Sequence, residues 1–191
     1  MPDNDNASYL VGQLLLAMPS MSDTRFEKAV IFMCAHDEQG AMGLVINHTL
    51  PDVTFKNLLK QVGITSDIRV NISDPVMSGG PVESSRGFLL HTNEFTQEDT
   101  IKINDALSVT GTIDALKEVA KGNGPEDMLF ILGYAGWAAG QLEQEIQDNA
   151  WLVSEPDPSI IFNDNHNNKW VSAVGKMGFD PGMLSSSAGR A

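Results

Sequence analysis

The stretch KAVIFMCAHDEQGAMGLVINHTLP, residues 28–51, gives the clearest indication of the fold. Two apolar runs, residues 29–35 and 42–46, flank the polar segment HDEQGA, which contains turn-forming residues and a glycine. Apolar runs separated by such a segment are typical of two antiparallel strands. The stretch therefore predicts a β-hairpin in the N-terminal part of the chain.

On both sides of this hairpin, the sequence predicts further strands and helices. Thr54 is a suitable cap and Gly63 a suitable stop for one short helix, and Thr112 is a suitable cap for another. Strands are expected at 9–19, 87–91, 101–111, 126–133 and 150–154, and helices at 54–63, 112–122, 138–149 and 168–178. Because the order departs from a regular βαβ repeat, we predict an α+β fold: a single compact domain, with a mixed β-sheet, an N-terminal hairpin and three to four packed helices.

Composition and charge restrict the classes of function. The 191 residues contain 12 Lys and Arg against 25 Asp and Glu, a formal net charge of −13, which disfavours direct binding of nucleic acid. Cys34 is the single cysteine, so no intramolecular disulfide can form, and a cytoplasmic protein is expected. The polar, acidic start lacks the features of a secretory signal, and no apolar run is long enough to span a membrane.

A first candidate site lies in LGYAGWAAGQLEQEIQDNAWL, residues 132–152. We expect a strand to end at Gly133 and a helix to begin between Trp137 and Gly140, so that free backbone N–H groups could bind an anion. The glycine spacing matches neither a dinucleotide fingerprint nor a P-loop, and Glu143 and Glu145 would oppose an anion. Close main-chain packing under the indole is the favoured interpretation, with a ligand role as the alternative.

Three other segments contain residues that could carry chemistry. SGGPV, residues 78–82, could form an oxyanion hole beside Ser78, but a chain-reversing turn is favoured. Cys34 and His36 would share a face of a strand, yet a buried structural cysteine is favoured. DNHNN, residues 164–168, is expected to be a solvated loop. No metal site and no cofactor are predicted.

The order and spacing of LLLAMPSMSDTRFEKAVIFMCAHDEQGAMGLVIN, SGGPVESSRGFLLH, LGYAGWAAGQLEQEIQDNAWL and the final GRA resemble the AlgH/YqgE family of bacterial proteins. The resemblance implies a domain over residues 9–184, with a flexible N-terminus at 1–8 and a tail at 185–191. It carries over no catalytic residue. Among the family's characteristic positions, those that we select as candidate ligand-binding residues are Asp23, Asn47, Gly79, Gly80, Gly133, Gly136, Trp137 and Gln141.

Three hypotheses about function remain open. The resemblance implies a regulator of gene expression that acts through a protein partner or small ligand, and the net charge of −13 opposes direct DNA contact. The second is an anion-binding or small-molecule-binding protein, or an enzyme, with its site between the 78–82 and 133–140 loops, which should then lie close together. The third is a self-associating scaffold, for which Trp137, Trp151 and Trp170 should be exposed. The residues do not decide whether the protein is an enzyme, although a protein without enzymatic activity is the favoured interpretation.

Overall fold

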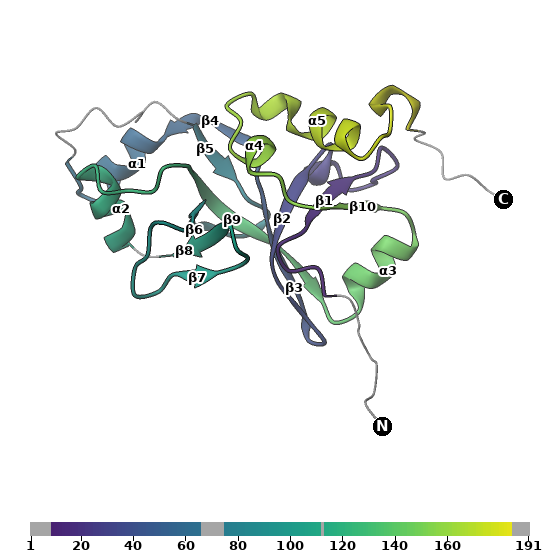
Figure 1. The fold of residues 1–191 in the computed structure, drawn as a ribbon, viewed down its shortest axis with the longest axis horizontal. Coiled ribbons are helices and arrows are strands. Elements are labelled where there is room, and N and C mark those ends of the chain that lie inside the picture. The colour runs from purple at the N-terminus through teal and green to yellow at the C-terminus, as the bar shows by residue number, and fades with distance from the viewer. Residues whose placement is uncertain (1–8, 66–74, 112, 185–191) are drawn as a thin grey trace.

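A strongly curled β-sheet runs through the whole molecule (Figure 1). The computed structural model describes residues 9–65, 75–111 and 113–184. Within these residues, the strands are β1 (Leu14–Ala17), β2 (Val30–Asp37), β3 (Gly40–Val45), β4 (Thr49–Thr54), β5 (Pro75–Ser78), β6 (Val82–Thr92), β7 (Ile101–Lys102), β8 (Leu107–Thr110), β9 (Met128–Ala138) and β10 (Trp151–Ser154). The helices are α1 (Phe55–Gln61), α2 (Ile113–Ala120), α3 (Gln141–Gln147), α4 (Pro158–Ile161) and α5 (Lys169–Lys176), with 3-10 turns η1 (Thr24–Phe26), η2 (His166–Asn168) and η3 (Pro181–Met183).

The strand order is β10-β1-β2-β3-β9-β6-β8-β7, with β4 and β5 branching from β9. Most pairs are antiparallel, but β5 runs parallel to β9, with Met77 opposite Ile131. The sheet is therefore mixed, and the α+β class is confirmed. The predicted hairpin is β2 and β3, joined by the two residues 38–39.

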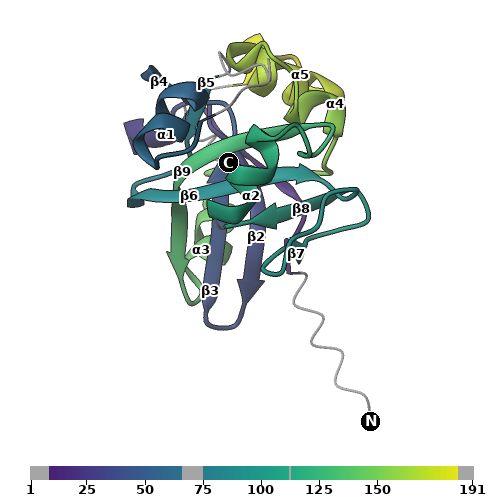
Figure 2. The same ribbon diagram turned by 90° about the vertical axis from the view of Figure 1, so that its left-hand side faces the viewer.

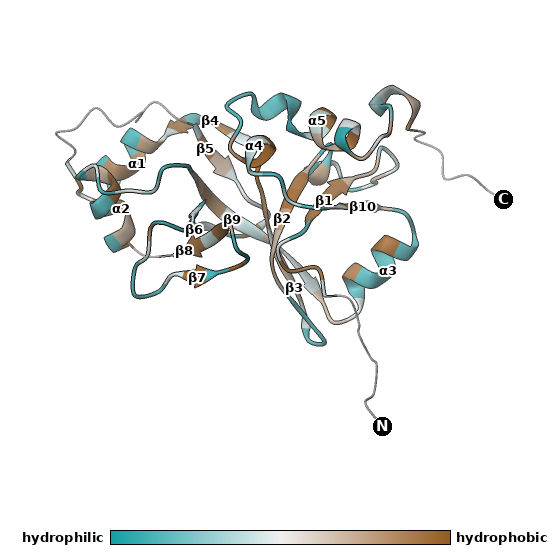
Figure 3. Cartoon of the chain, viewed as in Figure 1, coloured by the Kyte–Doolittle hydropathy of each residue, from teal (hydrophilic) through white to brown (hydrophobic). Residues whose placement is uncertain are grey.

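Three apolar cores lie against this sheet, and helices close them (Figures 1 and 3). The central core lies under α4 and α5 and includes Phe32, Leu90, Ile131 and Trp170. On the opposite face, the α3 core includes Trp137, Leu142 and Trp151, and the α1–α2 core includes Phe55, Leu116 and Phe130. Figure 2 shows α2 in front of the β6 and β8 part of the sheet. Several strand sequences are nearly continuous apolar runs because the sheet packs against an apolar core on each of its two faces.

Strand β9 contributes side chains to all three cores. This is possible because the regular alternation of its side chains between the two faces of the sheet is interrupted by a slip at Gly133. Before the slip, Ile131 faces the central core and Phe130 faces the α1–α2 core. Three residues after Ile131, Tyr134 again packs on the central core, although a regular strand would place it on the other face. Gly133 has φ +78°, a conformation that side chains disfavour, and this residue makes the slip. Trp137 is thereby directed under α3.

Several local predictions are confirmed. Thr54 caps α1 by accepting a hydrogen bond from the N–H of Asn57, and Gly63 follows the helix with φ +74°. The predicted N-terminus (1–8), the tail (185–191) and the predicted cap Thr112 lie outside the described residues.

Other predictions need correction. Residues 101–110 form a hairpin, β7 and β8, and not one strand, because Asn104 Oδ1 accepts hydrogen bonds from the N–H groups of Ala106 and Leu107 and closes a turn. Strand β9 continues to Ala138 and does not end at Gly133, since it stays paired with β3. The short helix α4, which is capped by Asp157, was not among the predicted helices.

Replacing Asp157 by Asn should lower stability in a pH-dependent way. Hydrogen bonding to Lys176 of α5, then to Ser159, lowers the pKa of this carboxyl to about 2. A depressed native pKa stabilises the fold above the ordinary value of 3.8 and loses that effect as the pH falls through about 2. Asparagine can still cap α4 but cannot form the ion pair with Lys176. We therefore expect the variant to lose about 1 kcal/mol in its free energy of unfolding at pH 7, and to lose less at about pH 3. Urea unfolding of the variant and the wild type at both pH values measures this loss. An equal loss at the two pH values would show that the ionised carboxylate of Asp157 does not contribute to stability.

Candidate functional site

The predicted glycine loops do lie side by side, and their main chains touch. The N–H of Gly79 donates to the carbonyl of Leu132 at 2.7 Å. A Cβ added to Gly79 would lie 2.2 Å from the carbonyl oxygen of Gly133, and one added to Gly80 would lie 2.2 Å from the carbonyl carbon of Tyr134. These contacts leave no space for a ligand between the two segments. The glycines allow the main chain at the end of β5 to approach β9 closely.

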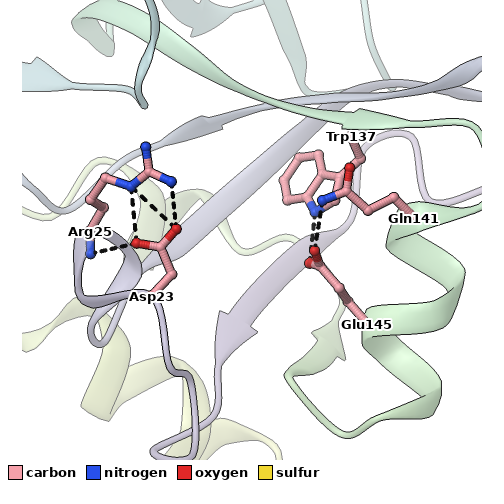
Figure 4. A network of polar contacts seen from close by, with 5 residues as sticks. All are labelled: Asp23, Arg25, Trp137, Gln141 and Glu145. Carbon is pink, nitrogen blue, oxygen red and sulfur yellow. Dashed lines mark hydrogen bonds and ion pairs between the residues drawn. The ribbon is translucent and has the colours of Figure 1, made fainter.

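Trp137 and Gln141 belong to a hydrogen-bond network around the carboxylate of Glu145 (Figure 4). Oε2 of Glu145 accepts the indole N–H of Trp137 at 2.9 Å and that of Trp151 at 2.8 Å. Its Oε1 accepts from the side-chain amide of Gln141 at 2.9 Å. The Oε1 of Gln141 in turn accepts from the N–H of Ala138 at 3.0 Å and holds the start of α3 against β9.

The two other polar candidates also serve the fold. Buried Asn47 accepts a hydrogen bond from the N–H of Val30 and donates to the carbonyl of Lys28, both at 2.8 Å, so it joins the ends of β2 and β3. Asp23 caps η1 and forms a two-pronged ion pair with the guanidinium of Arg25, at 3.0 and 2.7 Å (Figure 4). This hydrogen bonding lowers the pKa of Asp23.

A small cavity of about 140 Å³ lies beside Gly80, lined by Arg25, His48 and Ser78 among others. The charge of Arg25 is already matched by Asp23, which argues against an anion site here. The Nε2 of His48 bonds to the carbonyl of Glu27 at 3.0 Å, and no hydrogen bond between His48 and the Ser78 hydroxyl is found in the described residues. In this structure, His48 therefore does not act on the Ser78 hydroxyl as the base of a catalytic pair.

Cys34 and His36 do not form a pair. The β2–β3 register slips between Met33 and Ala35, and His36 uses its two nitrogens to accept from the N–H of Leu10 and to contact Glu143 at 2.7 Å. Burial raises the pKa of the Cys34 thiol to about 12, so the nucleophilic thiolate is not formed near neutral pH. Across residues 9–65, 75–111 and 113–184, no three His, Cys, Asp or Glu side chains are grouped to hold a metal ion.

The tryptophans do not form an exposed surface. Trp137, Trp151 and Trp170 retain 7%, 4% and 4% of their surface, respectively, so they provide no patch for self-association. In the described part of the chain, no helix is long and apolar enough to cross a membrane.

Gly136 is the candidate that the fold leaves unexplained. It is exposed, and its backbone is not in the left-handed region. A Cβ added there would meet nothing nearer than 3.6 Å, from Tyr134 Cε2. Unlike Gly79, Gly80 and Gly133, this residue could be replaced by alanine without a clash.

Comparison with known proteins decides the family. A family model described as AlgH-like matches residues 14–182. The chain belongs to the AlgH-like family. This AlgH-like chain is 50% identical to a UPF0301 protein of Bradyrhizobium sp. (strain BTAi1) over 97% of its length and 89% of the relative's, and 48% identical to one of Methylocella silvestris over 97% and 94%.

Two solved structures are similar to this AlgH-like fold. The solution structure of AlgH from Pseudomonas aeruginosa superposes with a TM-score of 0.77 and 37% identity, covering 97% of both chains. A crystal structure of a Corynebacterium diphtheriae protein gives a TM-score of 0.67 at 23% identity, over 86% of this chain and 85% of that one, and shows a shared fold alone.

Sequence reasoning missed one feature in the segment expected to be a solvated loop. Asn163, Asp164 and Asn165 are exposed, but His166 is partly buried and lines a cavity of about 250 Å³. Desolvation, then the nearby charge of Lys169, lowers the pKa of His166 to about 4. The sequence gives no sign that His166 is partly buried, because its neighbours on both sides are polar. The side chains that cover it come from distant segments of the chain.

Proposed function

We propose that this AlgH-like protein is a cytoplasmic regulator of gene expression that binds another protein and does not contact DNA itself. The observation that supports binding of a partner is the exposed Gly136 in β9. A glycine within a strand costs roughly 0.5–1 kcal/mol relative to alanine, and no contact with the other described residues requires a glycine at position 136. Glycines at such positions occur where a second backbone or a ligand approaches closely.

The surroundings of Gly136 suit the approach of another main chain. Met42 lies opposite it on β3, and exposed Ala138 follows on the same face of β9. Tyr134 and Val82 are the nearest side chains, at 3.6 and 3.8 Å from an added Cβ. Gly136 therefore leaves the backbone of β9 uncovered between the side chains of Met42, Tyr134 and Val82, which lets a partner pack directly on it.

The charges of the described residues favour a protein partner over DNA. Of the ten Lys and Arg in these residues, six form ion pairs with Asp or Glu of the same chain, namely Arg25, Arg86, Lys102, Lys117, Lys121 and Lys176. Lys169 is buried. DNA binding requires several positive side chains that are free to displace counterions from phosphates. Together with the net charge of −13, this arrangement argues against a DNA-binding surface.

The test compares Gly136→Gln with Gly175→Gln. Gly175 lies exposed on α5 with nothing within 4 Å of an added Cβ, so it is a matched control on another surface. Both variants should melt within about 2 °C of the wild type, because neither creates a clash. In a strain that lacks the gene, Gly175→Gln should restore wild-type transcript levels and Gly136→Gln should not.

Two outcomes would overturn the proposal. One is full restoration of transcript levels by a folded Gly136→Gln protein. The other is a sequence-specific mobility shift of duplex DNA by the purified wild-type protein at sub-micromolar concentration and about 150 mM salt, conditions that specific DNA-binding proteins tolerate.

A further inference from the structure

The cavity beside His166 is built from four separate parts of the chain. Phe55 begins α1, Pro75 begins β5, Phe130 lies in β9, and Phe162 and His166 belong to the segment between α4 and α5. The rings of Phe55 and Phe130 contact each other with centroids 5.7 Å apart. An apolar cavity of about 150 Å³ can hold benzene, so the roughly 250 Å³ present here can hold a ring with a substituent.

The imidazole of His166 makes no hydrogen bond with the described residues. Its Nδ1 is buried and has almost no accessible surface, so a ligand in the cavity cannot reach that atom. The nitrogen left for a ligand is Nε2, because His166 lines the cavity and Nε2 is not among the buried atoms. The neutral imidazole, which predominates above a pKa of about 4, offers one nitrogen as an acceptor.

The charges near the cavity disfavour an anion. Asp164 contributes a carboxylate to the wall. The nearby cation is Lys169, which is buried and donates from Nζ to the carbonyl of Ile46 at 3.0 Å. Desolvation lowers the pKa of this ammonium to about 7, so only part of its charge is present near neutral pH. Within the part of the chain that the structure describes, a negatively charged ligand would therefore meet a carboxylate without a free cation to offset it.

From this geometry we infer that the cavity binds a small neutral molecule with an aromatic or similarly apolar body and one hydroxyl or N–H group, which donates to His166. Phe55, Phe130 and Phe162 contact the apolar body, and the imidazole fixes its orientation. This site is separate from Gly136 and does not depend on the proposed protein partner.

Three probes of similar size test the inference on the wild-type protein: phenol, toluene and benzoate. We expect phenol to bind with a Kd of about 1 mM, a plausible affinity for a seven-atom ligand. Toluene lacks the donor and should bind about fivefold more weakly, the factor expected for one net hydrogen bond. Benzoate should bind at least about tenfold more weakly than phenol because of its charge. Titrations followed by ¹H–¹⁵N spectra give the three affinities, and the shifts should centre on Phe162, Asp164 and His166.

Variants then assign the preference to the imidazole. In His166→Phe, phenol and toluene should bind equally, whereas the control His48→Phe, outside the cavity, should keep the wild-type ratio. Absence of saturable phenol binding, benzoate binding tighter than phenol, or shifts located away from this cavity would each overturn the inference. These wild-type measurements remain decisive if His166→Phe does not fold.

Discussion

Replacing Gly80 by alanine is expected to lower the free energy of unfolding by more than about 4 kcal/mol, or to prevent folding. Gly80 has φ +147°, which L side chains rarely adopt. An added Cβ would lie 2.2 Å from the carbonyl carbon of Tyr134 and 2.4 Å from the N atom of Ala135. Both are main-chain atoms of β9, which is paired with neighbouring strands, so the clash cannot be relieved by rotating a side chain.

Gly136→Ala provides the comparison within β9. Its Cβ would make only ordinary contacts, so we expect a change between zero and a gain of about 1 kcal/mol. Urea unfolding of the two variants and the wild type gives the free energies of unfolding. If Gly80→Ala does not fold, its yield of folded protein is compared with that of the wild type. A Gly80→Ala protein with the wild-type midpoint would show that the main-chain contact between residues 79–80 and β9 is not required.

Replacing Glu145 by glutamine is expected to lower the free energy of unfolding by about 3 kcal/mol. The carboxylate accepts three hydrogen bonds, from the indoles of Trp137 and Trp151 and from the amide of Gln141. A glutamine of nearly the same shape presents an NH₂ group to at least one of these donors. At least one N–H is then left without an acceptor, and the charge that strengthened all three bonds is removed.

Glu155→Gln is the matched control for this prediction. Glu155 is exposed, and the substitution removes the same charge outside the network, so its effect should stay within about 0.5 kcal/mol. Denaturant unfolding followed by tryptophan fluorescence measures the free energy of unfolding of both variants. Fluorescence is suitable because two of the network's donors are indoles. Equal stability of the two variants would show that Glu145 does not anchor α3 to the sheet.

Much of the local structure follows from sequence patterns. The apolar runs at 29–35 and 42–46 predict β2 and β3, because the residues that form a two-residue turn lie between them. Thr54 and Gly63 predict the ends of α1 for the same kind of reason: capping depends on side chains and backbone angles within a few residues.

The candidate site could be predicted only in part. The proximity of the two glycine segments was predicted correctly, yet the strand was expected to end at Gly133, where it continues to Ala138. A glycine that makes a bulge inside a strand has the same local sequence as one that ends it. Pairing with Gly40 and Met42 of β3 keeps this segment extended, and that pairing joins residues about a hundred positions apart.

The sequence by itself determined the α+β class, the hairpin, the ends of α1 and the negative charge that disfavours nucleic acid, because each depends on composition or on residues close together in the chain. Only the tertiary structure decided the separate roles of glycines that look alike. It places Gly79 and Gly80 against the backbone of β9 and leaves Gly136 exposed. It also brings His166 to a cavity whose walls come from four separate segments of the chain. The physical reason is that available space and unpaired polar atoms are set by neighbours that only the folded chain brings together.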